Sequence, residues 1–189
     1  MSLKRARWLL NLDKHAVNDI LDTLVEAGPE GTLTAAQFTN AMLLLVRLGG
    51  NLDSRTSDYE EASSLLGRLF DAFDEDGVGV VNLSLLTSGL STLCDVPMSE
   101  KISFAFTVYD QDGDGLVSLS ELVDYMTSVF NVLFVTSTDI KGMLEPGVSM
   151  SQLATATATQ AFSEAGLSPR SKLDQASFTT FVQRGIGFM

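Results

Sequence analysis

Residues 110–121 read Asp-Gln-Asp-Gly-Asp-Gly-Leu-Val-Ser-Leu-Ser-Glu, and this stretch decides the predicted fold. Its aspartates stand at positions one, three and five, with a glycine at position six and a glutamate at position twelve. A hard divalent cation such as calcium takes about six to eight oxygen ligands, which a twelve-residue loop of this spacing supplies. The glycine at position six permits the positive-φ turn that wraps the chain around an ion. The sequence therefore predicts one calcium-binding loop.

We expect six residues of this loop to hold the ion. They supply three aspartate carboxylates, one main-chain carbonyl, one hydroxyl that acts directly or through a water, and one bidentate glutamate. In chain order they are Asp110, Asp112, Asp114, Leu116, Ser118 and Glu121. Val117, at position eight, is expected to form a short strand that pairs with a neighbouring loop, because a lone strand edge needs a partner. Whether magnesium occupies the same site at rest stays open.

Apolar residues flank the loop at helical spacing on both sides. They are Ile102, Phe104, Phe106 and Tyr109 before the loop, and Leu122, Tyr125, Met126 and Phe130 after it. Across the chain, similar patterns predict helices at 13–26, 35–48, 57–73, 83–92, 99–109, 119–134, 150–164 and 174–184. Residues 51–59 are predicted to form a polar linker, and 135–148 a longer loop.

Local signals and charge add detail to this assignment. Gly49 and Gly50 end the helix at 35–48, and Ser149 followed by Gln152 forms a capping-box pattern at the start of the helix at 150–164. The basic residues before Trp8 are interpreted as a solvated helix start, with contact to a membrane or an acidic partner as the alternative. The apolar run at 130–135 fits either the core or a groove for a partner.

Three further segments share the register of the calcium loop, which indicates an internal repeat. They are residues 26–37, 74–85 and 166–177, with Leu33, Val81 and Leu173 at position eight. In segment 74–85, Val78 removes the oxygen of position five and Leu85 removes the closing acid. We predict that this segment binds metal weakly or not at all. Pro29 in the first segment and Lys172 in the last make metal binding unfavourable there.

The helix–loop–helix pattern around a complete ligand set resembles the EF-hand superfamily. The stretch from Leu90 to Met126 is similar to the third hand of neuronal-calcium-sensor-like and calaxin-like proteins, and to the calcium-binding region of plant and animal NADPH oxidases. The resemblance implies an all-α fold of two lobes, each made of paired helix–loop–helix units with short β pairing between their loops. It places an N-lobe at 1–94 with two degenerate hands, and a C-lobe at 95–189 with one competent and one degenerate hand. The lobes would present an apolar face to a target helix.

Composition narrows the function classes. The formal net charge is −12 and the pI about 4.3, so the surface repels nucleic acid and attracts cations and basic segments. Cys94 is the only cysteine and His15 the only histidine, which excludes an internal disulfide, a Cys/His zinc site and a His-based triad within this chain. We find no nucleophile–base pair or phosphate-binding glycine loop, and we expect a protein that is not an enzyme.

Two functions stay open. The first is a calcium sensor that binds a protein target, expected to be an amphipathic helix, in a calcium-responsive way. The second is a constitutive, light-chain-like docking subunit of a cytoskeletal or ciliary assembly with one structural calcium site. A simple calcium buffer is disfavoured because one site gives little capacity. No secretory signal or myristoylation pattern is present, so we expect a cytoplasmic protein without a membrane partner.

Overall fold

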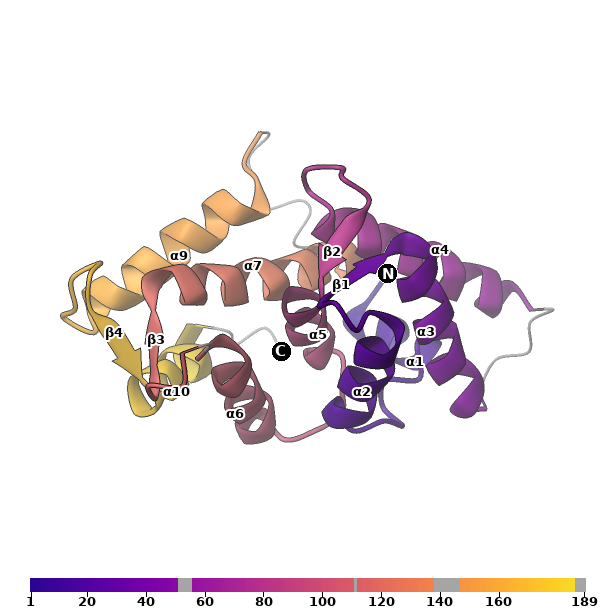
Figure 1. Cartoon of the computed structure of the whole chain (residues 1–189), viewed down its shortest axis with the longest axis horizontal. Helices are drawn as coiled ribbons and strands as arrows, with labels where there is room; N and C mark the ends of the chain where they lie inside the picture. Colours follow the sequence, from indigo (N-terminus) through magenta and orange to yellow (C-terminus); the bar gives the residue numbers. More distant parts are fainter. Residues whose placement is uncertain (51–55, 111, 138–146, 186–189) are drawn as a thin grey trace.

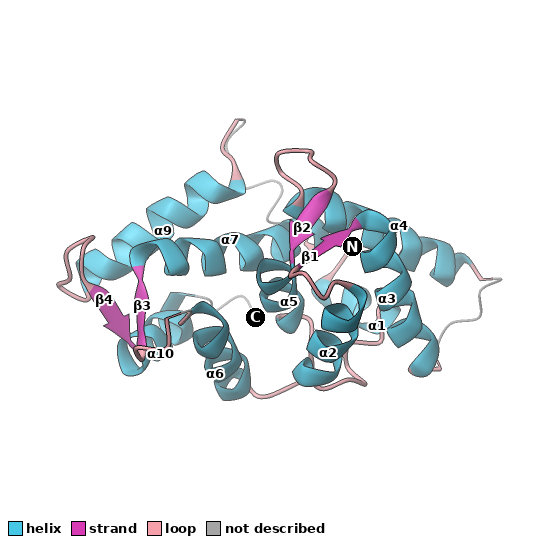
Figure 2. Ribbon diagram, viewed as in Figure 1, coloured by secondary structure: helices cyan, strands magenta, loops and turns pink. Residues whose placement is uncertain are grey.

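The computed structural model describes residues 1–50, 56–110, 112–137 and 147–185, and within them the chain is mostly helical (Figure 2). The helices are α1 (Leu3–Leu9), α2 (Val17–Ala27), α3 (Ala35–Leu48), α4 (Ser57–Phe73), α5 (Leu83–Ser91), α6 (Met98–Tyr109), α7 (Leu119–Thr136), α9 (Met150–Glu164) and α10 (Gln175–Gly185). The strands are β1 (Thr32–Thr34), β2 (Val80–Asn82), β3 (Leu116–Ser118) and β4 (Lys172–Asp174). This arrangement confirms the predicted all-α class with short β pairs.

The strands form two small antiparallel sheets, β1 with β2 and β3 with β4. Leu33 is paired with Val81 in the first sheet, and Val117 with Leu173 in the second. All four side chains are buried, while their neighbours along each strand are exposed or half-buried. The predicted pairing of the position-eight residues is therefore confirmed, and each sheet joins two of the repeated segments.

The buried side chains form two hydrophobic clusters. The first contains residues of α1 to α5, and it also takes Val132 and Val135 from the end of α7. The second contains residues of α6, β3, α9, β4 and α10, together with α7 residues between Leu122 and Leu133. Helix α7 therefore runs through the middle of the molecule and contributes to both clusters (Figure 1). The predicted lobe boundary at residues 94 and 95 stays a prediction.

Most helix predictions agree with the structure to within two residues. Helices α3 and α4 have the predicted bounds, and Ser149 and Gln152 form the predicted capping box. The helix predicted at 13–26 is wrong in its first turn, because α2 begins at Val17, where the Asp19 carboxylate accepts a hydrogen bond from Ala16 N. Residues 51–55 of the linker and 138–146 of the long loop lie outside the described residues. Helix α7 extends to Thr136, two residues into the predicted loop.

The N-terminal segment forms α1, which is more than a solvated helix start. Ala6 and Leu9 are fully buried in the first cluster. Arg5 of the same helix forms ion pairs with Asp58 at 2.5 Å and with Glu61 at 2.6 Å, both on α4. Lys4 and Trp8 are exposed, as expected for a solvated helix start, whereas Ala6 and Leu9, which that interpretation did not include, pack in the core.

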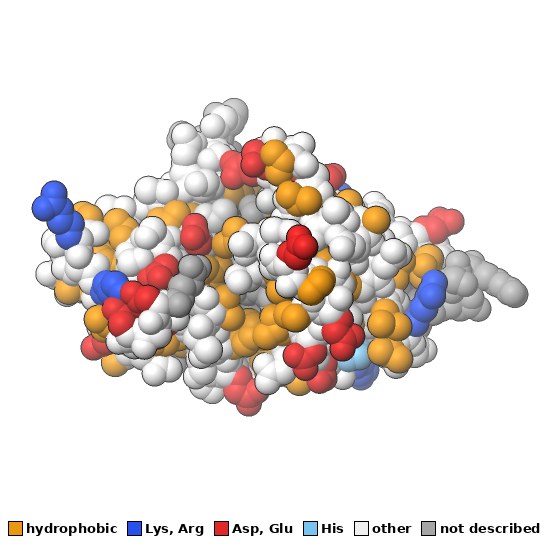
Figure 3. Space-filling view, viewed as in Figure 1, with side chains coloured by type: hydrophobic (Ala, Val, Ile, Leu, Met, Phe, Trp, Pro, Cys, Tyr) orange, Lys and Arg blue, Asp and Glu red, His pale blue; other side chains and the backbone are white. Residues whose placement is uncertain are grey.

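A groove of about 560 Å³ lies between α2 and α6. Its lining includes Val17, Leu21, Phe104 and Val108, with Glu100 beside them. Figure 3 shows hydrophobic side chains in this hollow. No described helix is both long enough and apolar enough to cross a membrane.

Candidate metal site

The calcium loop predicted at 110–121 lies between α6 and α7. Helix α6 ends at Tyr109, so Asp110 takes the C-cap position, and β3 leads directly into α7. Gly115 has a φ of +76°, as predicted for position six, and Gly79 has a φ of +82° at the same position of segment 74–85. An L side chain rarely adopts this conformation, so the two loops share a backbone feature that glycine permits. Gln111 lies outside the described residues.

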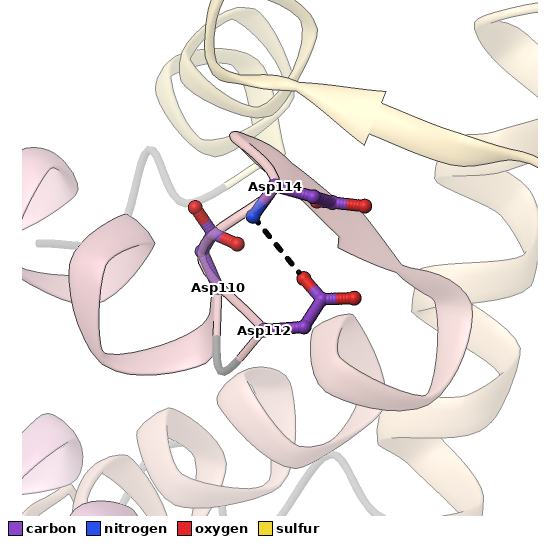
Figure 4. Close-up of side chains that lie close together, drawn as sticks. All are labelled: Asp110, Asp112 and Asp114. Atoms are coloured by element: carbon purple, nitrogen blue, oxygen red, sulfur yellow. Dashed lines mark hydrogen bonds between the residues drawn. The ribbon is translucent and has the colours of Figure 1, made fainter.

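The structure brings three of the six predicted ligands together. One carboxylate oxygen each from Asp110, Asp112 and Asp114 lie within 4.8 Å of one another. Figure 4 shows these side chains around the turn, with the main-chain N of Asp114 donating to Asp112 Oδ1 at 3.3 Å. Gly115 N donates to Asp110 Oδ2 at 2.9 Å, and Leu116 N donates to Asp114 Oδ1 at 2.9 Å. Main-chain donors thus hold all three carboxylates in place.

Asp110 carries the oxygen that fits a cation best. Its Oδ1 is buried and has no hydrogen-bond partner among the described residues. A buried carboxylate oxygen without a donor is costly, and a bound cation would remove this cost. The donor set here is made of carboxylate oxygens, which are the ligands that calcium and magnesium prefer. The three aspartates therefore fit a hard divalent cation.

Glu121 is not part of this cluster. Its Oε2 accepts a hydrogen bond from Ser118 N at 2.7 Å, while Glu121 N donates to Ser118 Oγ at 3.3 Å. The two residues form a capping box at the first turn of α7, which satisfies two helix-end N–H groups. Ser118 Oγ also lies 3.0 Å from Ser120 Oγ. Leu116 belongs to β3, where it pairs with Asp174. The ligand roles of Leu116, Ser118 and Glu121 stay predictions.

The sequence did not indicate the partner of the aspartate cluster, which is Lys172 of β4. Its Nζ lies 2.7 Å from Asp112 Oδ2 and 2.5 Å from Asp114 Oδ2. This hydrogen bond lowers the pKa of the Asp112 carboxyl, and the two aspartates raise the pKa of Lys172. Lys172 was predicted from the sequence only to disfavour metal binding in its own segment, 166–177. The register of Val117 with Leu173 was the signal that could have placed it over segment 110–121.

Four aromatic side chains, Phe106, Tyr109, Tyr125 and Phe178, pack together next to the start of the loop. Tyr109, directly before Asp110, stacks edge-on against Tyr125 of α7 with ring centroids 5.6 Å apart. Phe178 of α10 lies 5.3 Å from Tyr125 and 5.7 Å from Phe106. The Tyr109 hydroxyl donates to Ser128 Oγ at 3.3 Å, and burial raises its pKa to about 12. These contacts pack the end of α6 against α7 and α10, and so fix the position of Asp110 at the start of the loop.

The other repeated segments do not group acids in this way. Among the described residues, the Asp110 cluster is the one place where three possible acidic, Cys or His ligands come together. In segment 74–85, both Asp74 oxygens accept a hydrogen bond from Gly79 N, at 3.1 and 3.0 Å. Val78, at position five, is 63% exposed and offers no side-chain oxygen.

Comparison with known proteins does not assign this chain to a family. No protein-family model matches this chain, and a search of curated proteins finds no significant match.

Proposed function

We propose that this chain is an EF-hand-type regulatory protein that binds one calcium ion at segment 110–121 and, in response, binds a protein target. The observation that carries this proposal is the unpartnered, buried Oδ1 of Asp110 beside the carboxylates of Asp112 and Asp114. Paired loops between helices, with a positive-φ glycine at position six, support the assignment to the EF-hand class. Bound there, calcium would supply the positive charge that the three aspartates and Glu121 would balance.

Glu121 links the loop to the rest of the molecule. Its carboxylate lies in the capping box of α7, so a change in its hydrogen bond to Ser118 N acts on the first turn of that helix. The other end of α7 lies in the first hydrophobic cluster, through Val132 and Val135. A single helix thus connects the proposed site to side chains of α1 to α5, which is the connection that a sensor needs.

The groove between α2 and α6 is the surface that we propose for the target. Its apolar lining matches the apolar face of an amphipathic helix, and Glu100 stands beside it. With a net charge of −12, the chain favours a basic segment over an acidic one. An enzymatic role is not part of this proposal.

A constitutive docking subunit is the second candidate. It is favoured by the other three repeated segments, in which no group of three acidic, Cys or His ligands comes together within the described residues. In that case the same groove would hold its partner with or without calcium.

Calcium titration calorimetry on the full chain tests the first proposal. We expect a single binding event with a Kd of roughly 10⁻⁷ to 10⁻⁵ M, the range of flexible sensor loops. Glu121→Gln should abolish the event, because it removes one carboxylate while keeping the shape of the side chain. Asp76→Asn is the matched control, since it removes one acid from segment 74–85 and should leave the titration unchanged. Absence of binding by the wild type, or two events of similar affinity, would refute the one-site proposal.

The response to calcium needs a second measurement. Main-chain NMR shifts of Val132 and Val135 should change on calcium addition if α7 transmits the signal. Calcium binding that leaves these shifts unchanged, together with calcium-independent target binding, would favour the docking subunit.

A further inference from the structure

The pairing of β3 with β4 determines where Lys172 lies. Ser118 is opposite Lys172 in this ladder, one residue from the buried pair of Val117 and Leu173. Because side chains alternate between the two faces of a strand, Lys172 lies on the face away from the core, where the aspartate loop is. Its ammonium group reaches residues 60 and 58 positions earlier in the chain.

Lys172 takes oxygens that the aspartates would otherwise offer to a metal. The Oδ1 atoms of Asp112 and Asp114 accept main-chain hydrogen bonds, and their Oδ2 atoms accept from Lys172. Three carboxylates within 4.8 Å of one another repel when nothing neutralises them. The ammonium group supplies positive charge to this cluster, although within the described residues its ion pairs are with Asp112 and Asp114 and not with Asp110.

We propose that Lys172 is a built-in counter-ion of the candidate calcium site and sets its affinity. A divalent cation bound to Asp112 and Asp114 meets this ammonium group at their oxygens and either displaces it or shares the carboxylates with it. In both cases Lys172 weakens calcium binding, through charge repulsion or through the loss of two ion pairs. The inference rests on the proposed function, because it concerns the same loop, and it adds a residue from a different segment to that site.

The test is calcium titration calorimetry on the full chain at low and at moderate salt, with three variants. Lys172→Gln should tighten calcium binding by about three- to tenfold, the range that one or two exposed ion pairs contribute. Lys172→Arg keeps the charge and should stay within about twofold of the wild type. Arg170→Gln is the matched control, since it removes the same charge from the same segment, and Arg170 is exposed and forms no ion pair within the described residues. The gain of Lys172→Gln should shrink as salt rises.

Urea unfolding in the absence of metal separates the loss of the Lys172 ion pairs from a general effect of the chain's net charge. In chelator, Lys172→Gln should lower the urea midpoint of unfolding relative to Arg170→Gln, because only the first change leaves the aspartates without their counter-ion. Equal calcium affinities of Lys172→Gln and Arg170→Gln would overturn the inference while leaving the proposed function in place. Binding by Lys172→Gln alone would support the inference and refute a calcium response of the wild type. Absence of binding by all variants would overturn both.

Discussion

Gly89 of α5 lies where this helix packs closely against α7. A methyl group at this position would lie 2.7 Å from the main-chain oxygen of Ser128 and 2.6 Å from the ring of Phe73. It would also lie 3.0 Å from Val132, one of the α7 residues in the first cluster. A main-chain atom cannot rotate away, so α5 and α7 must separate to admit the methyl group. Gly89→Ala therefore tests how much stability the contact between these helices contributes.

The magnitude follows from two opposing effects. Alanine gains about 1 kcal/mol over glycine from helix propensity. Overpacking a tight core contact costs about 1–3 kcal/mol, and we take the upper end because a main-chain atom is involved. The free energy of unfolding should thus fall by about 2 kcal/mol, which lowers Tm by roughly 4–8 °C in a chain of this size. Gly67→Ala on α4 is the matched control, since a methyl group there meets no atom within 4 Å, and it should raise Tm by roughly 2–4 °C.

Urea and thermal unfolding in chelator, followed by far-ultraviolet circular dichroism, measure both variants without a contribution from metal. If Gly89→Ala is as stable as the wild type, or as stable as Gly67→Ala, the close packing of α5 on α7 is not what holds these helices together. This contact would then not couple α7 to α5, and only Val132 and Val135 would connect α7 to the first cluster.

Two further predictions concern the buried thiol and the groove. Burial raises the pKa of Cys94 to about 11 from a usual value near 9.0. The free energy of unfolding should therefore fall as pH rises from about 9 to about 11, because in this range the unfolded chain has released the thiol proton and the folded chain has not. Cys94→Ala should remove this part of the slope in urea unfolding at stepped pH, and an unchanged slope would assign it to other groups. Ser103→Arg adds bulk and positive charge to the lining of the groove, and should weaken binding of a basic Leu- and Lys-based amphipathic peptide at least about threefold. Ser64→Arg, an exposed change on α4, should not, and equal losses would place the peptide elsewhere.

Local signals in the sequence were enough for most of the fold. The bounds of α3 follow from a threonine cap at Thr34 and a glycine after Leu48, and both act within a few residues. Position eight of the repeated segments, where Leu33 and Val117 stand, was enough to predict the strand pairs. Helix α1 was harder to interpret, because its partners, such as Asp58 and Glu61 for Arg5, stand more than fifty positions away in the chain. Spacing along the chain carries no information about such partners.

The candidate site shows the same division. The cluster of Asp110, Asp112 and Asp114 follows from their spacing in a tight turn, so the sequence predicted it directly. Glu121 was predicted as a ligand from its position, yet it also stands three residues after Ser118, where a glutamate forms a capping box. These two roles use the same carboxylate oxygens, and spacing does not rank one above the other. Lys172 required the register of two strands and the length of a lysine side chain, which only the folded chain combines.

Both Glu121 and Lys172 bear on the choice between the two proposed functions. At the candidate site, Asp110 Oδ2, both oxygens of Asp112 and Asp114, and Glu121 Oε2 accept hydrogen bonds from donors within the chain, whereas the buried Asp110 Oδ1 has no such donor among the described residues. A cation that binds Asp112, Asp114 or Glu121 competes with these donors, which lowers its affinity and couples binding to a change in the contacts of the loop. A permanent structural site would gain from the opposite arrangement, with its ligands free of internal partners. These internal contacts favour a site that binds and releases calcium reversibly. The calcium affinity of Lys172→Gln relative to that of the wild type measures how much of the weakening comes from this one side chain.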